Sequence, residues 1–254
     1  MDWNKLFPKI YIINLEYRKD RKKHMKKLLK DLNRTNYEFI NATDRDEKNW
    51  INALIEIGVI KNKNEYKPEL LFTNKYKKKL ESEDEDTKKS YQGKIAVTLS
   101  HLRIYNKISK SKNNKLNLIF EDDIFLEQNF NKESFSDLYK KAIKNKVDVL
   151  YLGDCIKHRS RDKKIIFKGE KNDLIKVSFV TCTHAYAINS RTSKIYLKNI
   201  LPMIRDIDDR ISDINTNEKN KINYLIFNKN IFKQIEDAKS DIDKYKFNKK
   251  NITN

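Results

Sequence analysis

Three consecutive carboxylates, Glu121, Asp122 and Asp123, directly follow the apolar run 116–120. A short apolar run after a polar break predicts a buried strand, so we expect the carboxylates where that strand ends and the sheet meets solvent. Acids this close together repel one another unless a cation neutralises them. Hard divalent cations prefer oxygen ligands and keep coordination positions for phosphate oxygens. The segment therefore predicts either a metal site that bridges carboxylates to a diphosphate or a solvated acidic turn.

The four glycines of the chain exclude the common phosphate-binding loops. They lie at positions 58, 93, 153 and 169, too far apart for either a dinucleotide-binding G-x-G-x-x-G or a P-loop. If the protein binds a nucleotide, its diphosphate must be held in another way, and a carboxylate-bound metal is one such way.

The chain is strongly basic, with 55 Lys and Arg against 36 Asp and Glu and a net charge of +19. Such a charge attracts nucleic acid, anionic lipid or anionic small molecules. The basic residues are spread along the chain, and we find neither interleaved aromatic and basic residues nor a helix-turn-helix signal. The pattern favours a lysine-rich solvated surface over a dedicated nucleic-acid interface.

The two cysteines, Cys155 and Cys182, are too few for a disulfide framework and fit no zinc spacing. We therefore expect two thiols in a reducing compartment. No apolar run reaches membrane-spanning length, and the N-terminal segment lacks the apolar region of a signal peptide. The sequence thus predicts a cytoplasmic protein, whose basic surface would also suit peripheral contact with an anionic membrane.

The apolar pattern predicts an α/β fold in one domain that spans 1–244, with a frayed tail at 245–254. It opens with a βαβ unit formed by strand 10–13, helix 18–33 and strand 37–40. The polar, charged segment 61–92 predicts a mobile insertion that buries little apolar surface. Further predicted elements are helices at 50–60, 95–108 and 135–143, strands at 147–152, 165–167, 175–180, 184–188, 222–227 and 231–235, and a helix that Ser190 caps and Pro202 ends.

Several segments, in order, resemble glycosyltransferase family 25, the group of bacterial lipopolysaccharide glycosyltransferases and collagen galactosyltransferases. The resemblance rests mainly on strand 10–15 with the arginines that follow it, on Gly-Lys-Ile-Ala-Val-Thr-Leu-Ser-His-Leu at 93–102, and on Leu-Ile-Phe-Glu-Asp-Asp at 118–123. Three positions depart from the family pattern: Lys94 replaces the usual Glu, Ala96 a Gly and Val97 a Cys. Weaker counterparts are segments 149–153 and 183–188, the pair Asp208 and Asp209, and Gln234 with 240–242.

The resemblance implies a GT-A-like mixed sheet flanked by helices that binds a nucleotide-sugar with Mn²⁺ or Mg²⁺. In that case Asp123 is the direct metal ligand, Glu121 acts through water or the ribose, and Asp122 either helps one of them or points into the protein. Family members invert the anomeric centre, so a carboxylate must deprotonate the acceptor hydroxyl. Asp208 is our first candidate for this base and Asp209 the second, although both would also suit the N-terminus of a helix.

The resemblance also suggests donor-binding residues, each with a plainer alternative. Asn14, Arg18 and Arg21 follow the first strand and would contact the nucleotide, unless the arginines are simply solvated. A loop residue, Asp44, would contact uridine or form a turn. Two further candidates, Ser100 and His101, lie on a predicted buried helix, where a lone histidine is usually part of the core.

Together these features predict an inverting, metal-dependent transferase that moves galactose, glucose or an N-acetylhexosamine from a UDP-sugar. The acceptor hydroxyl would belong to a glycan, a lipid-linked saccharide or a collagen-like protein. Two alternatives stay open: a nucleic-acid-binding basic protein, and a nucleotide-sugar-binding protein that has lost catalysis, as the departure at Lys94 would permit.

Overall fold

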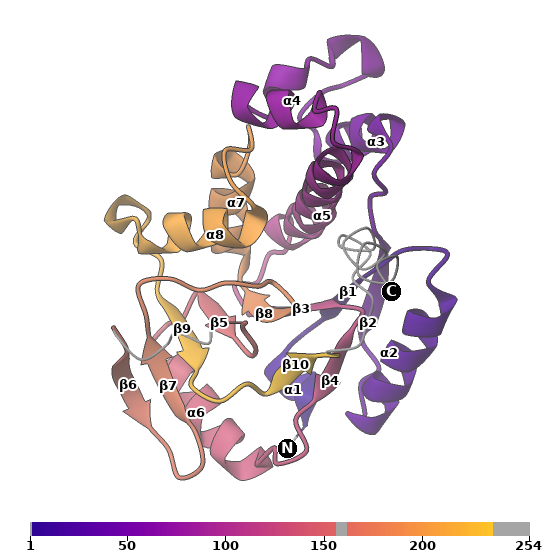
Figure 1. Cartoon of the computed structure of the whole chain (residues 1–254). Helices are drawn as coiled ribbons and strands as arrows, with labels where there is room; N and C mark the ends of the chain where they lie inside the picture. The colour runs from indigo at the N-terminus through magenta and orange to yellow at the C-terminus, as the bar shows by residue number, and fades with distance from the viewer. Residues whose placement is uncertain (1, 156–161, 236–254) are drawn as a thin grey trace, which may run out of the picture.

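The computed structural model describes residues 2–155 and 162–235 of the 254-residue chain. The predicted tail at 245–254 and the segment 240–242 lie outside the described residues. An eight-stranded mixed sheet has the order β2-β1-β3-β8-β5-β9-β7-β6, and a separate two-stranded ribbon pairs β10 with β4 (Figure 1). The strands are β1 (Ile10–Asn14), β2 (Tyr37–Asn41), β3 (Asn117–Glu121), β4 (Ile124–Leu126), β5 (Val149–Tyr151), β6 (Lys164–Lys168), β7 (Asp173–Lys176), β8 (Ala185–Ile188), β9 (Tyr224–Phe227) and β10 (Phe232–Gln234).

The opening βαβ unit is confirmed, because β1 pairs in parallel with β2 and α2 (Lys19–Asp31) connects them. On its other side β1 pairs in parallel with β3, which carries the acids. This pairing brings the carboxyl ends of β1, β2 and β3 to one edge of the sheet. The sequence-predicted α/β class with a mixed, helix-flanked sheet agrees with this architecture.

Alternate residues of each central strand pack into two separate cores. On β1, Ile10 and Ile12 face a core shared with α1 (Trp3–Leu6), α2 and α6 (Lys132–Lys144), whereas Tyr11 faces the opposite core. That second core contains residues of α3 (Glu47–Ile57), α4 (Asn74–Leu80), α5 (Glu85–Ser109), α7 (Ser190–Asn199) and α8 (Ile207–Thr216). In Figure 1 these five helices gather on one side of the sheet. Burial on both faces explains why the central strands are continuous apolar runs.

The segment 61–92 buries more apolar surface than its composition predicts. Leu71, Phe72 and Tyr76 are all buried, and Leu71 has no exposed surface. The prediction of little apolar burial was wrong because a few large side chains, spaced among lysines, anchor the segment on the helical core. Helix α5 also begins within it, at Glu85, where acidic residues in the first turn favour the helix N-terminus.

Several elements differ from prediction: β7 ends at Lys176 although a strand was predicted over 175–180, and α1 and β4 were not predicted. Asn189, rather than the predicted Ser190, caps α7, since its side chain accepts a hydrogen bond from the Thr192 amide. Three short 3₁₀ segments, Lys63–Glu65, Pro68–Leu70 and Glu218–Asn220, complete the described elements. Among the described residues, no helix has the length and apolar character needed to cross a bilayer.

Gly153, which follows β5, lies where the sheet comes close to the β4–β10 ribbon. A Cβ atom at this position would lie 2.2 Å from Nε2 of His184 and 2.3 Å from the carbonyl oxygen of Phe232. We predict that Gly153→Ala lowers the free energy of unfolding by about 3 kcal/mol, because one of its two neighbours is backbone. Thermal unfolding should show a loss of about 5–10 °C.

The matched control is Gly58→Ala, at the end of α3. A Cβ atom there meets nothing within 4 Å, but the backbone has φ +79°. This variant should lose about 1 kcal/mol from backbone strain alone. Equal losses at the two positions would show that the close approach at Gly153 relaxes without cost.

Candidate active site

The three acids lie where β3 ends and the chain turns into β4. Glu121 is the last residue of β3, and Asp122 and Asp123 form the turn before Ile124. Asp122 is buried, and the side chain of Asp123 is 13% exposed. The apolar run therefore delivers the carboxylates to the sheet edge, as the sequence predicted.

Asp122 is held from two sides by the first βα unit. The Asn14 amide donates to its Oδ2 at 2.7 Å, and Arg21 donates to its Oδ1 at 2.8 Å. Burial raises the pKa of Asp122, although both donors oppose the rise. Asn14 and Arg21, predicted to contact the nucleotide, thus position the acidic turn, and a nucleotide contact by either stays a prediction.

Glu121 is fixed by residues from three other elements. Thr183 donates from its hydroxyl to Oε1 at 2.9 Å, and Gln234 donates from its amide to Oε2 at 3.3 Å. The Nε2 atom of His101 lies 3.6 Å from Oε1, while its Nδ1 is 2.9 Å from the hydroxyl of Tyr186. Burial opposes ionisation of Glu121, but His101 and Thr183 outweigh it and hold its pKa below the usual value. His101 is therefore buried, as a core histidine would be, and also faces the acidic cluster.

Asp123 is the least satisfied of the three acids. Its Oδ1 is buried without a hydrogen-bond partner in the described part of the chain, while its Oδ2 lies 3.4 Å from Arg21. Burial, followed by the charge of Glu121, raises its pKa to about 6. A buried, partly repelled carboxylate with an unpaired oxygen is the feature that a bound cation would relieve.

The predicted base candidates lie close to this cluster in the first turn of α8. Asp208 accepts hydrogen bonds from the backbone amides of Cys182 (3.0 Å) and Asp209 (2.9 Å). Since Thr183 follows Cys182 and binds Glu121, one short segment connects the two groups of acids. Burial and the charge of Asp208 raise the pKa of Asp209. Asp208 and Asp209 also lie in the first turn of α8, which agrees with the alternative prediction that they are helix N-terminal residues.

Cys155 and Cys182 form a disulfide, so the prediction of two thiols was wrong. Cys155 follows β5 and Cys182 precedes β8; these strands pair antiparallel, which brings the two loops together at one sheet edge. Spacing alone could not reveal this pairing, because it depends on strand order. The disulfide anchors the segment before β8. This segment includes Thr183, whose hydroxyl donates to Glu121.

A pocket of about 570 Å³ lies at the carboxyl ends of β1 and β2. Asp44, predicted to contact uridine, lines it with Asn41 and Arg103. Ser100 does not line this pocket; its hydroxyl donates to the Ala96 carbonyl and accepts from the Thr43 amide, so it holds the loop after β2 in place.

Arg18 precedes α2 and forms a two-pronged ion pair with Asp20, at 3.0 and 2.9 Å. Its predicted contact with the nucleotide stays a prediction.

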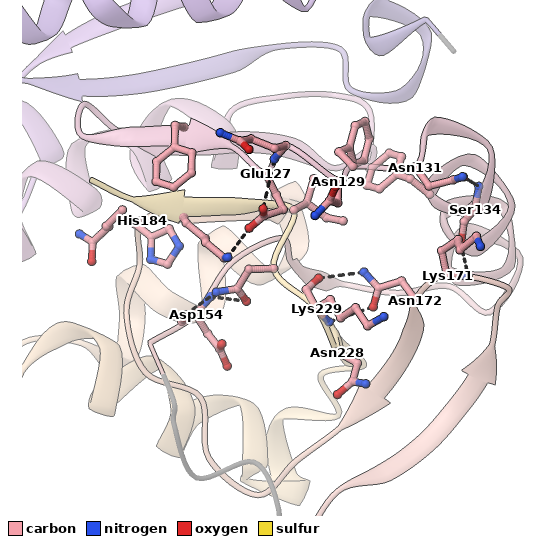
Figure 2. Close-up of a pocket in the computed structure, with 18 of the residues that line it drawn as sticks. Glu127, Asn129, Asn131, Ser134, Asp154, Lys171, Asn172, His184, Asn228 and Lys229 are labelled. Carbon is pink, nitrogen blue, oxygen red and sulfur yellow. Dashed lines mark hydrogen bonds and ion pairs between the residues drawn. The ribbon is translucent and has the colours of Figure 1, made fainter. Parts of the chain in front are cut away.

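A second pocket, of about 1080 Å³, is lined in part by Gln234, the residue that donates to Glu121, and Figure 2 shows other residues of its walls. Its walls come from the β4–β10 ribbon, the start of α6 and the loops after β5 and β9. Among its residues, the sequence pointed to Cys155, Gln234 and, within segment 183–188, His184, but not to a shared pocket. The remaining signal, asparagines clustered at 129–131 and 228–230, is common in surface loops and so did not point to a site.

A comparison with protein families matches residues 7–211 to the family described as glycosyltransferase family 25 (LPS biosynthesis protein). The chain belongs to glycosyltransferase family 25. The match includes all three acids, segment 93–102 and the pair Asp208 and Asp209, but it ends before β9 and β10. No curated protein matches this chain significantly. The candidate site of this family 25 glycosyltransferase therefore combines residues within the family match with Gln234 beyond it.

The raised pKa of Asp123 makes this carboxylate a cost to stability. With a pKa of about 6 in the folded protein against 3.8 as the ordinary value, the penalty is absent below about pH 4, develops up to pH 6 and is fully present above it. We predict that Asp123→Asn raises the free energy of unfolding by about 1–3 kcal/mol at pH 7.5 without divalent cations. Thermal unfolding in EDTA between pH 4 and 8 measures this gain, which should vanish at the acidic end.

The matched control is Asp137→Asn. Asp137 lies on the surface of α6 and pairs with Lys141 at 2.8 Å, so its loss should change stability little at any pH. A variant at Asp123 that is less stable than the wild-type protein at pH 7.5 would contradict the prediction, because it would mean that Arg21 more than offsets the burial.

Proposed function

We propose that this glycosyltransferase transfers a hexose from a UDP-sugar to a hydroxyl acceptor, with inversion and with the help of a divalent cation. The buried, unpaired Oδ1 of Asp123 carries the proposal. A hard cation would give this oxygen a partner and would neutralise the repulsion between Asp123 and Glu121.

The residues fit Mn²⁺ or Mg²⁺ with different roles for the three acids. Asp123 offers a free oxygen, and Glu121 lies beside it with a pKa held low, so that it is ionised at neutral pH. Asp122 is less suited, because Asn14 and Arg21 occupy both of its oxygens. A bound cation would supply positive charge to the leaving diphosphate. This arrangement would replace the glycine-rich loop that the sequence lacks.

The 570 Å³ pocket supports the nucleotide part of the proposal. It lies at the ends of β1 and β2, where open α/β sheets bind ligands, and its volume falls within the range of small-molecule sites. Arg103 donates to Glu56 at 2.6 Å and to the carbonyl of Asn41, which fixes one wall. Asp44 is exposed at the pocket, where its carboxylate would accept a hydrogen bond from uridine.

The pair Asp208 and Asp209 supplies the proposed base. Two backbone amides orient Asp208, which leaves further lone pairs for an acceptor hydroxyl. Asp209 is our second candidate, since a raised pKa makes a carboxylate a stronger base. Lys94 replaces the Glu of the family pattern, and this replacement was the reason to keep the noncatalytic alternative open. Its side chain pairs with Asp206, just before α8, at 2.8 Å. This contact gives Lys94 a supporting role next to the proposed base.

We predict that UDP with Mn²⁺ raises the melting temperature of the wild-type protein by about 5–10 °C at a hundred times Kd, since a ligand specific for the folded state adds about 2.7 kcal/mol. Asp123→Asn should lose the effect that requires Mn²⁺, and Asp137→Asn should keep it. Differential scanning fluorimetry with EDTA as the metal-free arm measures both. A full response in the Asp123 variant would overturn the metal assignment.

We predict that replacing the base lowers turnover without weakening donor binding. Asp208→Asn should cut kcat by about 10²–10⁴-fold, the usual contribution of a general base, while the UDP–Mn²⁺ shift stays the same. Asp209→Asn should have the smaller effect. UDP release from a panel of UDP-hexoses in the presence of saccharide acceptors provides the assay. Wild-type protein that binds UDP-sugars but never releases UDP would favour the noncatalytic alternative.

A further inference from the structure

The 1080 Å³ pocket opens next to the acidic cluster. Gln234 lines the pocket and donates to Glu121 at 3.3 Å, and His184 lines it directly after Thr183, the other donor to Glu121. The 570 Å³ pocket lies on the β1–β2 side, whereas this one lies at β5, β9 and the ribbon. A molecule in the larger pocket would therefore approach the acids from the side opposite the nucleotide.

The walls of this pocket are rich in carboxamides. An amide side chain both donates and accepts hydrogen bonds, as a sugar hydroxyl does. Some of these amides hold the wall itself: Asn172 donates to the carbonyl of Lys229 at 2.8 Å and accepts from its amide at 2.9 Å. The pocket amides are Gln128, Asn129, Asn131, Asn172, Asn228, Asn230 and Gln234.

An aromatic side chain also faces the pocket. Phe125 lies between Ile124 and Leu126 on β4, and those two neighbours pack into the core on the other face of the ribbon. Since strand residues alternate, Phe125 points to the pocket face together with its cross-strand partner Lys233. It remains partly exposed and offers a flat apolar surface to the C–H face of a sugar ring.

The charges of the pocket are uneven. Lys233 pairs with Glu127, which neutralises both, and Asp154 lies near the His184 side. Figure 2 shows Lys171 and Lys229 away from His184, toward the opposite side of the pocket. Lys229 is exposed and forms no ion pair within the described residues. Lys171 lies 3.7 Å from Glu170 in an exposed pair, so Lys229 supplies most of the positive charge on the side remote from the acids, where it would attract an anionic group.

From these walls we propose that the 1080 Å³ pocket is the acceptor subsite and that it takes an acidic saccharide. The sugar ring would lie on Phe125 with its hydroxyls on the amides. Its carboxylate or phosphate would lie toward Lys229 and Lys171, and the acceptor hydroxyl toward Glu121. This assignment rests on the proposed function and names its acceptor class.

The test compares 3′-sialyllactose, which carries one carboxylate, with neutral lactose. Calorimetric titration into the full chain with UDP and Mn²⁺ at low salt should give at least about fivefold tighter binding of sialyllactose, and salt at 0.5 M should remove most of that preference. Lys229→Ala combined with Lys171→Ala should bring the ratio of the two affinities below about two. Phe125→Ala should weaken both saccharides to the same degree.

The matched control is Lys198→Ala, an exposed lysine on α7, which should leave both affinities unchanged. Every variant should keep the UDP–Mn²⁺ shift in melting temperature, which shows that it is folded and binds the donor. Equal affinities for the two saccharides, no measurable binding of sialyllactose, or a preference that survives loss of both lysines would overturn the proposal. Loss of the UDP–Mn²⁺ response in the wild-type protein would instead overturn the proposed function.

Discussion

The candidate active site depends on the buried contact between Asp122 and the first βα unit. Asn14 comes from the end of β1 and Arg21 from α2, and both donate to this carboxylate at less than 3 Å. Breaking such a buried pair costs about 3–5 kcal/mol, so the turn has little freedom to open. With Asp122 turned toward the protein, its two neighbours are left at the sheet edge. One acid of the triplet thus serves the fold so that the other two remain available for a ligand.

A network of buried polar side chains lies next to Glu121, between α5 and the sheet. His101 on α5 lies beside Glu121 and contacts the Tyr186 hydroxyl, which in turn contacts Tyr105. Nearby, Asn215 bridges the hydroxyls of Tyr151 and Tyr196. Within this network only Nε2 of His101 lacks a hydrogen-bond partner among the described residues, and it faces Glu121 at 3.6 Å. Buried networks of this kind allow few alternative arrangements, because further unpaired polar groups would be costly in the core. The position of Glu121 is therefore coupled to the packing of α5 and α7 against the sheet.

The spacing of apolar residues in the sequence correctly predicted the elements that bury a regular apolar face. The opening βαβ unit, the acid-bearing strand and the buried half of α5 all have clear periodicity, and the structure contains each of them. The contact between His101 and Glu121 could not be predicted from local patterns, because it depends on how α5 packs on the sheet. The disulfide could not be predicted because it depends on the pairing of β5 with β8. The packing of segment 61–92 depends on three buried side chains that are spaced among many lysines. The large pocket had no signature, because loops from distant parts of the chain form its walls.

Because β10 is the last described strand, the candidate site is completed late in synthesis of the chain. Gln234 and the amide of Ile235 reach back to Glu121 and Asp123, across more than a hundred residues of sequence. Domains form as the chain emerges from the ribosome, N-terminal parts first. The acids, α5 and most of both cores are thus synthesised before β10, which adds the buried Phe232 to one core. A nascent chain halted before β10 would carry all three carboxylates but would lack the hydrogen bonds from Gln234 and the Ile235 amide that fix Glu121 and the acidic turn.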